Sequence, residues 1–179
     1  MQIVALLRGV TPVGKNKIPK MSALVELLEQ EGFQQVKSYI QSGNIILDTD
    51  LSHEEVSKKI HDVIKENIGA NLSVIIKTKE DLKIALTENP FDDSYDYSRI
   101  HLVFTNDAID EIKLEEVRHT MFFPEIFQEG TSCMYLFLPR EAPKKKLNTN
   151  FLEKKLGITG TMRKANVIQH LFDMMDDAD

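Results

Sequence analysis

Cysteine and long apolar runs are scarce in this sequence of 179 residues. The single cysteine, Cys133, cannot form a disulfide within the chain, which favours a reducing, cytosolic environment. No stretch of about 18 apolar residues occurs, which excludes a membrane-spanning helix. Residues 1–8 lack a basic start and a small-residue cleavage site, so a signal peptide is not indicated. We therefore expect a cytoplasmic protein that does not engage a membrane.

Motifs for metal binding and catalysis are also missing. The five histidines are scattered, and neither HExxH nor CxxC spacing is present, so we expect no metal site and no cofactor. No GxSxG sequence surrounds a serine. Cys133 opens an apolar strand, where a lone cysteine usually packs as a small hydrophobic residue. The sequence assigns no catalytic residue and leaves open whether the protein is an enzyme.

Charge is unevenly distributed along a chain of otherwise ordinary composition, with 42% hydrophobic and 28% charged residues. The formal net charge is -6. Residues 80–116 hold eleven acidic and three basic side chains, whereas residues 139–164 hold eight basic and two acidic ones. Opposite charges of this kind can steer a charged partner, and they also occur simply as solvated faces.

Hydrophobic periodicity predicts a complete folding unit in residues 1–78. An apolar strand at 2–7 precedes a helix at 21–32, then a hairpin turns at Ser42-Gly43-Asn44, a second helix begins at Ser52, and a strand covers 72–77. Glu55, three residues after Ser52, completes a capping box. The order strand, helix, strand, strand, helix, strand is the split βαβ pattern of ferredoxin-like (α/β-plait) domains.

The same order of elements recurs after a linker helix that stops before Pro90. The expected elements are strands at 99–105, 125–128, 133–138 and 159–162, and helices at 109–121, 148–156 and 164–175. We therefore predict an α+β fold of tandem ferredoxin-like (α/β-plait) domains, 1–78 and 79–179. The second domain includes the linker helix and an extra C-terminal helix.

The loop after the first strand is the first half of a candidate ligand site. It runs from Arg8 to Lys17 and precedes a helix, so backbone N–H groups and Lys15 could hold a phosphate or carboxylate. It is not a P-loop, because Asn16 stands where a Ser or Thr would meet Mg²⁺. A solvated surface loop is the alternative interpretation.

The hairpin turn is the second half of this candidate site. The first and third strands of a plait are antiparallel neighbours, so Arg8 and Asn44 should meet at one edge of the sheet. The residues expected to contact a small anionic ligand are Arg8, Lys15, Asn16, Lys17, Gln41, Ser42 and Asn44. Turn formation alone would also explain the three residues of the hairpin.

Two further functions stay open. A nucleic acid could contact the basic segment formed by Arg140, Lys144, Lys145, Lys146, Lys154, Lys155, Arg163 and Lys164. No RNP1-like aromatic sequence accompanies it, and the acidic isoelectric point near 5.4 argues against this partner. The third function is a protein-interaction module that uses a sheet face. The sequence assigns no oligomeric state.

Five stretches together resemble a large, mainly bacterial family, domain of unknown function 1697 (DUF1697). They are Leu6-Leu7-Arg8-Gly9-Val10, Val13-Gly14-Lys15-Asn16-Lys17, Glu31-Gly32-Phe33, Tyr39-Ile40-Gln41-Ser42-Gly43-Asn44, and residues 147–157. The resemblance implies a tandem α/β-plait fold and no reaction. The family's loop usually reads Ile-Asn-Val-Gly-Gly, whereas residues 10–14 lack that Asn and one Gly. Near the C-terminus the family commonly has Arg-Asn-Trp, whereas this chain has Arg163-Lys164-Ala165.

Overall fold

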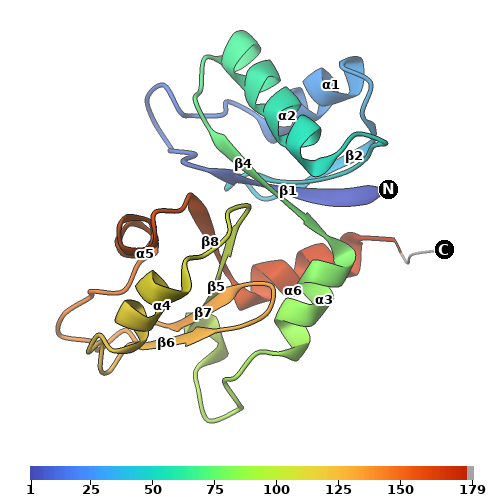
Figure 1. Ribbon diagram of the computed structural model, residues 1–179. Helices are drawn as coiled ribbons and strands as arrows, with labels where there is room; N and C mark the ends of the chain where they lie inside the picture. The colour runs from blue at the N-terminus through green and yellow to red at the C-terminus, as the bar shows by residue number, and fades with distance from the viewer. Residues whose placement is uncertain (177–179) are drawn as a thin grey trace. The chain divides into compact units, whose positions relative to one another are not determined.

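Residues 1–176 are described by the computed structural model, and they divide into two compact units (Figure 1). The first unit consists of Met1–Lys79 together with residues 171–176, and the second of Glu80–His170. Each unit contains one antiparallel sheet of four strands. The predicted α+β fold class of two ferredoxin-like units is confirmed.

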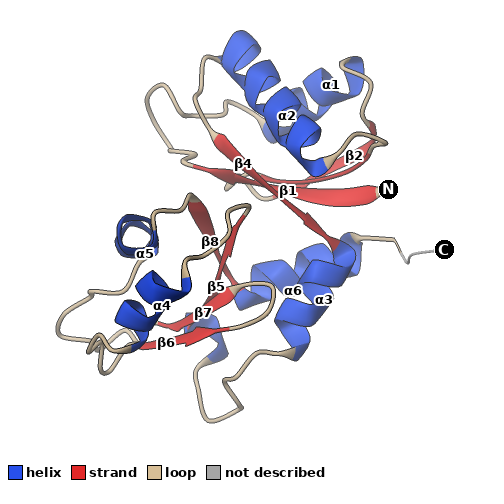
Figure 2. Cartoon of the chain, viewed as in Figure 1, coloured by secondary structure: helices blue, strands red, loops and turns tan. Residues whose placement is uncertain are grey.

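In the first unit, the strands are arranged in the order β2-β3-β1-β4, and all three pairings are antiparallel. The strands are β1 (Gln2–Arg8), β2 (Gln34–Tyr39), β3 (Asn44–Asp48) and β4 (Ser73–Thr78). The helices α1 (Met21–Gln30) and α2 (His53–Ile68) lie on one face of this sheet (Figure 2). The loop that leads to α1 therefore begins at the end of the central strand β1.

The start and end of α2 follow from local chemistry. Ser52 accepts a hydrogen bond from the Glu55 amide, and the Glu55 carboxylate accepts one from the Ser52 amide, so the predicted capping box is present. Gly69 ends the helix in the left-handed region with φ 84°. The apolar stripe of α2 packs on alternate residues of β1, and the buried core of the unit includes Ile3, Ala5, Leu7, Leu24, Leu28, Val56, Ile60 and Ile64.

The second unit repeats this topology, with the strand order β6-β7-β5-β8. Its strands are β5 (Ile100–Thr105), β6 (Ile126–Glu129), β7 (Met134–Phe137) and β8 (Gly160–Lys164). The helices α4 (Glu111–Arg118) and α5 (Thr149–Leu156) share a buried core with one sheet face, formed in part by Val103, Leu114, Val117, Leu136 and Leu152. Structural duplication without an obvious residue repeat is thus observed.

The helix α4 is shorter than the predicted range of 109–121. The Asp110 carboxylate accepts hydrogen bonds from the amides of Ile112 and Lys113, so it fixes the helix start at residue 111. The helix ends at Arg118, with His119 as its C-cap, and the chain then turns through Phe123 and Pro124, which are joined by a cis peptide bond. Residues 119–123 are consequently outside the helix.

The linker helix α3 (Lys79–Thr87) covers the opposite face of the second sheet. The Tyr135 hydroxyl donates to the Ala85 carbonyl oxygen at 2.6 Å, and Ser132 Oγ donates to the Asp81 carbonyl at 2.9 Å. Burial raises the pKa of Tyr135. The hydroxyl therefore stays protonated and holds α3 against the sheet.

The C-terminal helix α6 (Ala165–Met174) begins in the second unit and ends in the first. Within the first unit, Lys79 Nζ donates to the Met175 carbonyl oxygen at 3.1 Å and lies 4.8 Å from the centre of the Phe172 ring. None of the helices within residues 1–176 is long and apolar enough to span a membrane.

His101 is a buried histidine on β5, with 6% of its surface exposed. Its Nδ1 atom lies 3.1 Å from the Arg99 carbonyl oxygen. Burial lowers the pKa of His101 below its ordinary 6.5, and the hydrogen bond to the Arg99 carbonyl opposes this shift in part. The positive charges of Arg99 and Lys164 add smaller effects that lower the pKa further.

We expect the free energy of unfolding to fall between pH 7 and pH 5 in a way that depends on His101. The unfolded chain, with the higher histidine pKa, takes up protons first as the pH drops through about 6.5, which favours unfolding. Urea denaturation of wild type and His101→Phe at both pH values measures the effect. A smaller pH dependence in His101→Phe is expected, with His53→Gln, an exposed histidine, as control. Equal pH dependence in all three proteins would contradict this assignment.

Candidate functional site

The loop between β1 and α1 is closed by its own hydrogen bonds. The Thr11 amide donates to the Asn16 carbonyl at 3.1 Å, and the Lys17 amide donates to the Gly14 carbonyl at 3.3 Å. The Thr11 hydroxyl donates to the Val13 carbonyl at 2.8 Å. Gly14 has φ +88°, a conformation that a side chain would strain. The loop therefore has a defined shape before any ligand binds.

Asn16 anchors this loop to the rest of the first unit. Its Oδ1 atom accepts a hydrogen bond from the Asn71 amide at 3.0 Å, just before β4. The side chain is half-buried, and its acceptor oxygen faces the protein backbone. Asn16 thus holds the loop in position, whereas the neighbouring Lys15 and Lys17 are exposed.

The loop before α1 carries three exposed lysines, Lys15, Lys17 and Lys20. Within residues 1–176, neither Lys15 nor Lys17 has an ion-pair or hydrogen-bond partner for its ammonium group. Lys20, also exposed, occupies the N-cap position, and no side chain caps the helix. Sequence reasoning omitted Lys20, although a lysine where Ser, Thr, Asp or Asn is usual could have drawn attention to it. Arg8 is half-buried at the end of β1, paired in register with Ser73.

The hairpin turn lies beside the end of β1, as the antiparallel arrangement requires. Leu6 is paired with Asn44, and the Leu7 amide donates to the Gly43 carbonyl at 2.9 Å. Gln41 Nε2 donates to the Ile18 carbonyl at 2.5 Å, which joins the turn to the loop. The predicted segments 8–17 and 41–44 are therefore brought together at one end of the sheet.

Asn44 shapes the turn from inside the protein. Its side chain is fully buried, and Nδ2 donates to the Tyr39 carbonyl and to Ser42 Oγ, both at 3.0 Å. Ile40, in the same turn, has φ 52°, which is unusual for a β-branched residue. Ser42 and Gln41 are exposed, whereas Asn44 is not.

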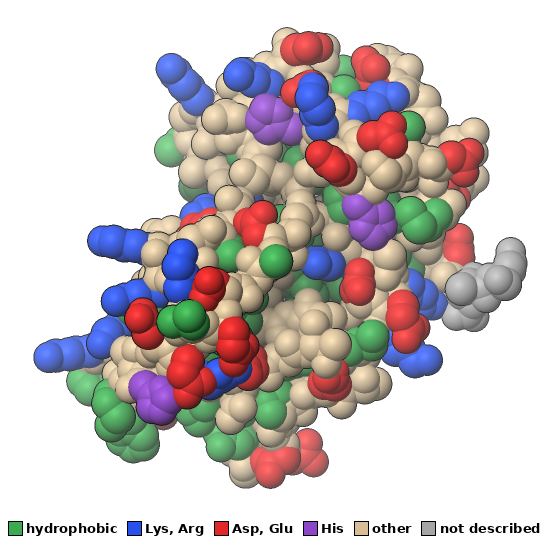
Figure 3. All heavy atoms as spheres, viewed as in Figure 1, with side chains coloured by type: hydrophobic (Ala, Val, Ile, Leu, Met, Phe, Trp, Pro, Cys, Tyr) green, Lys and Arg blue, Asp and Glu red, His purple; other side chains and the backbone are tan. Residues whose placement is uncertain are grey.

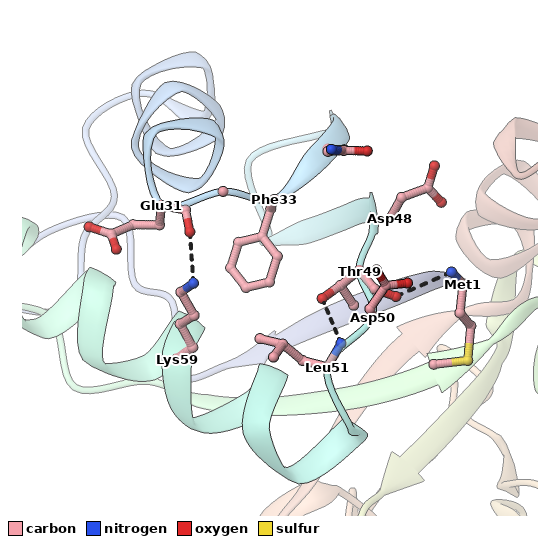
Figure 4. Close-up of a pocket in the computed structure, with 10 residues that line it drawn as sticks. Met1, Glu31, Phe33, Asp48, Thr49, Asp50, Leu51 and Lys59 are labelled. Atoms are coloured by element: carbon pink, nitrogen blue, oxygen red, sulfur yellow. Dashed lines mark hydrogen bonds between the residues drawn. The ribbon is translucent and has the colours of Figure 1, made fainter.

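A second hollow lies at the opposite end of the same sheet, where Gln2 pairs with Asp48 (Figure 4). Its volume is about 490 Å³, and its lining residues include Met1, Glu31, Phe33, Asp48, Asp50, Leu51 and Lys59. Lys59 Nζ donates to the Glu31 carbonyl at 2.7 Å and lies 5.0 Å from the centre of the Phe33 ring. The sequence carried no motif for this hollow, because its walls come from two separate connections, from Met1 and from Lys59 of α2.

The side chains around this hollow do not converge on a common point. The Glu31 and Asp48 carboxylates are turned away from the Phe33 ring (Figure 4). The Lys59 ammonium is already engaged with a carbonyl and an aromatic ring. A binding site usually needs a few polar groups aimed at one ligand position, and the side chains of this hollow do not provide them.

The basic segment 140–164 is only partly available at the surface. Its exposed members are Arg140, Lys144, Lys145, Lys146, Lys154, Lys155 and Lys164. Arg163 is buried and donates to Thr161 Oγ1 at 2.5 Å and to the Met162 carbonyl at 3.0 Å. Burial lowers the pKa of Arg163 to about 10. A phosphate backbone at the surface would meet the lysines and not this arginine.

Metal ligands do not cluster in the part of the chain that the structure describes. No group of three or more His, Cys, Asp or Glu side chains in residues 1–176 is placed to hold a metal ion. Cys133 is buried at the start of β7.

Comparison with known proteins identifies a family and a structural neighbour. The family described as "Protein of unknown function (DUF1697)" matches residues 1–135, which include the loop and the turn but not the basic segment. The conserved bacterial protein SP0830 from Streptococcus pneumoniae has a similar structure, with a TM-score of 0.77 over 98% of each chain and 23% sequence identity. That identity establishes a shared fold. No curated protein matches the chain.

Replacing Gly43 by alanine should strongly destabilise the protein. Gly43 has φ +94°, and an added Cβ would stand 2.8 Å from Leu7 Cβ. The left-handed backbone alone costs about 1–3 kcal/mol for a residue other than glycine, and the overlap with Leu7 adds to it. Gly69→Ala is the matched control, because Gly69 has φ +84° but no atom within 4 Å of the added Cβ. Chemical denaturation should show a larger loss for Gly43→Ala, and equal losses would disprove the close approach.

Proposed function

We propose that this chain, which belongs to the DUF1697 family of proteins of unknown function, binds a small anionic ligand between loop 8–20 and turn 41–44. The main support is a loop that is fixed by its own hydrogen bonds and exposes Lys15 and Lys17. Within residues 1–176, neither ammonium group has a partner. A preformed loop loses little conformational entropy when it binds a ligand, so its lysines would bind an anion at a low entropic cost.

The start of α1 adds to the attraction for an anion. A helix N-terminus carries a partial positive charge and N–H groups that side chains often satisfy. Here Lys20 occupies the N-cap and provides no side-chain acceptor. An anion beside Lys15, Lys17 and Lys20 would thus meet both charge and backbone donors, which suits a phosphate or carboxylate group.

The candidate residues divide into contacting and positioning roles. Lys15, Lys17, Lys20 and Ser42 would face the ligand, with Arg8 at the end of β1. Gln41 would do both, since it is exposed and also joins the turn to the loop through the Ile18 carbonyl. Asn16 and Asn44 hold the loop and the turn through hydrogen bonds to backbone groups. The protein would act in the cytosol, in keeping with its single, buried cysteine.

A thermal-shift and calorimetry screen tests this function, with phosphate, sulfate, nucleotides and phosphorylated metabolites as probes. A ligand at about 100 times its dissociation constant should stabilise the native protein by about 2.7 kcal/mol. Lys15→Ala/Lys17→Ala should remove most of this stabilisation while leaving the unliganded protein folded, because both side chains are exposed.

Lys144→Ala/Lys145→Ala is the matched control, since it changes the net charge equally at exposed positions outside the loop. It should retain the ligand-induced shift. If no probe stabilises the wild type, or if both double variants lose binding equally, the loop is not a specific anion site.

A nucleic acid is the second candidate ligand, favoured by the six exposed lysines of the basic segment. Binding of short single-stranded RNA should then weaken steeply as salt increases, because each neutralised phosphate releases counterions. In this case Lys144→Ala/Lys145→Ala loses affinity and Lys15→Ala/Lys17→Ala retains it, the reverse of the result expected for the loop.

A further inference from the structure

A chain of hydrogen bonds connects the helix α2 with the loop between β1 and α1. The Asn71 amide, which follows α2, donates to Asn16 Oδ1 at 3.0 Å. The side-chain oxygen of Asn71 lies 2.8 Å from Nε2 of His61, on α2. The other ring nitrogen, Nδ1, lies 3.1 Å from Oδ1 of Asp62. A titratable side chain is therefore joined to this loop through a single residue, Asn71.

The loop is held from both sides around Lys17. Asn71 holds Asn16 on one side. On the other side, Gln41 Nε2 in the hairpin turn donates to the Ile18 carbonyl oxygen at 2.5 Å. Lys17 stands between the two anchored residues. A displacement of Asn71 would therefore act on one end of the segment that carries this lysine.

Both oxygens beside the His61 ring can only accept hydrogen bonds. One belongs to the carboxylate of Asp62 and the other to the side-chain carbonyl of Asn71. An imidazole donates from both nitrogens only when it carries two protons. The neutral ring would turn a nitrogen lone pair toward one of the two oxygens, and the two would repel each other. The observed arrangement therefore suits the protonated ring.

Asp62 stays ionised on one side of the ring. Hydrogen bonds hold the pKa of its carboxyl group below the ordinary 3.8, first the bond from Lys58 and then the bond from His61. Lys58 Nζ donates to Asp62 Oδ2 at 2.9 Å, and Glu66 is a further acidic neighbour of Lys58. The carboxylate therefore keeps its charge between pH 5 and pH 8, the range in which histidine side chains ordinarily gain or lose a proton.

The ring of His61 is open to solvent. The exposed fraction is 32% for the His61 side chain and 42% for that of Asp62. Figure 3 shows purple histidine side chains among blue basic and red acidic ones over α2. The connection at 69–72 holds no charged residue, and the loop contributes the cations Lys15 and Lys17. His61 can therefore bind a proton while the unit stays folded.

We propose that protonation of His61 strengthens anion binding by the loop, so that the affinity for a small anion rises as the pH falls from 8 to 6. The protonated ring donates to Asp62 and Asn71 together, and Asn71 in turn holds Asn16. When the ring loses a proton, one of these bonds is lost. The loop is then held less firmly, so binding costs more conformational entropy. This regulation rests on the proposed function, because it acts on the same loop.

Calorimetric titration of the full chain with sulfate at pH 6 and pH 8 tests this regulation. Sulfate keeps its charge between these values, and both lie above the isoelectric point near 5.4, at which the protein would be least soluble. The wild type should bind sulfate about five-fold more tightly at pH 6, a low value for coupling between two sites. Lys15→Ala/Lys17→Ala should bind at neither pH, which assigns the heat of binding to the loop.

His61→Gln keeps a polar side chain that cannot titrate, so the ratio of the two sulfate affinities should fall close to one. His53→Gln is the matched control, since His53 is exposed on the same helix but lies outside this chain of hydrogen bonds. It should keep the wild-type ratio. Circular dichroism at both pH values checks that each variant is folded.

Asn71→Ala separates the hydrogen-bond route from a direct attraction between the charged ring and sulfate. The variant keeps the backbone amide that donates to Asn16, and it removes the side-chain oxygen that faces His61. The pH dependence of sulfate binding should therefore disappear although His61 is still present. A direct attraction would leave the pH dependence unchanged.

A wild type that binds sulfate equally well at both pH values would overturn the regulation and leave the anion site standing. Unchanged pH dependence in His61→Gln or in Asn71→Ala would also overturn it, as would sulfate binding by Lys15→Ala/Lys17→Ala. If the wild type binds sulfate at neither pH, the regulation is wrong, and the other anions of the screen decide the proposed function separately.

Discussion

Antiparallel pairing of β1 with β3 is the interaction on which the first unit depends. It places Leu7 against Gly43, where a side chain would bring its Cβ within 2.8 Å of Leu7 Cβ, so that only glycine fits. The same pairing brings the loop after Arg8 to the turn at 41–44. Both the core of this unit and its candidate site therefore depend on the register of this strand pair. A shift of the register by one residue would move every side chain of β1 to the other face of the sheet.

Hydrogen bonds within the site divide its residues by function. Gln41, Asn16 and Asn44 donate to or accept from backbone groups, and they give the loop and the turn their shapes. The lysines make no such contacts within residues 1–176 and stay in solvent. A loop held in this way would lose little conformational entropy on binding a ligand.

The two units share a topology but not a surface. The loop from β1 to α1 is basic, whereas the equivalent connection from β5 to α4 contains Asp107 and Asp110. Asp107 Oδ2 accepts a hydrogen bond from the Thr159 amide at 2.7 Å, and Asp110 caps α4. In the second unit, the two aspartates of this connection therefore have structural roles.

Periodicity and caps in the sequence determined the elements and their order. The Ser52 capping box, Gly157 after α5 and the repeated strand-helix-strand pattern act over a few residues, so local sequence was enough to predict tandem ferredoxin-like units. The sequence also predicted that loop 8–17 lies near turn 41–44. The strands β1 and β3 are antiparallel neighbours in this topology, so the end of β1 lies beside the start of β3.

Only the tertiary structure decided what each polar residue does. Asn44 and Lys15 are equally polar in the sequence, yet one is fully buried and the other exposed. Arg163 looked like part of a basic surface and is buried instead, and the exposed Phe123 could not be distinguished from the buried Phe122 beside it. Burial depends on which segments far apart in the chain pack together, and no pattern within a short stretch of sequence contains that information.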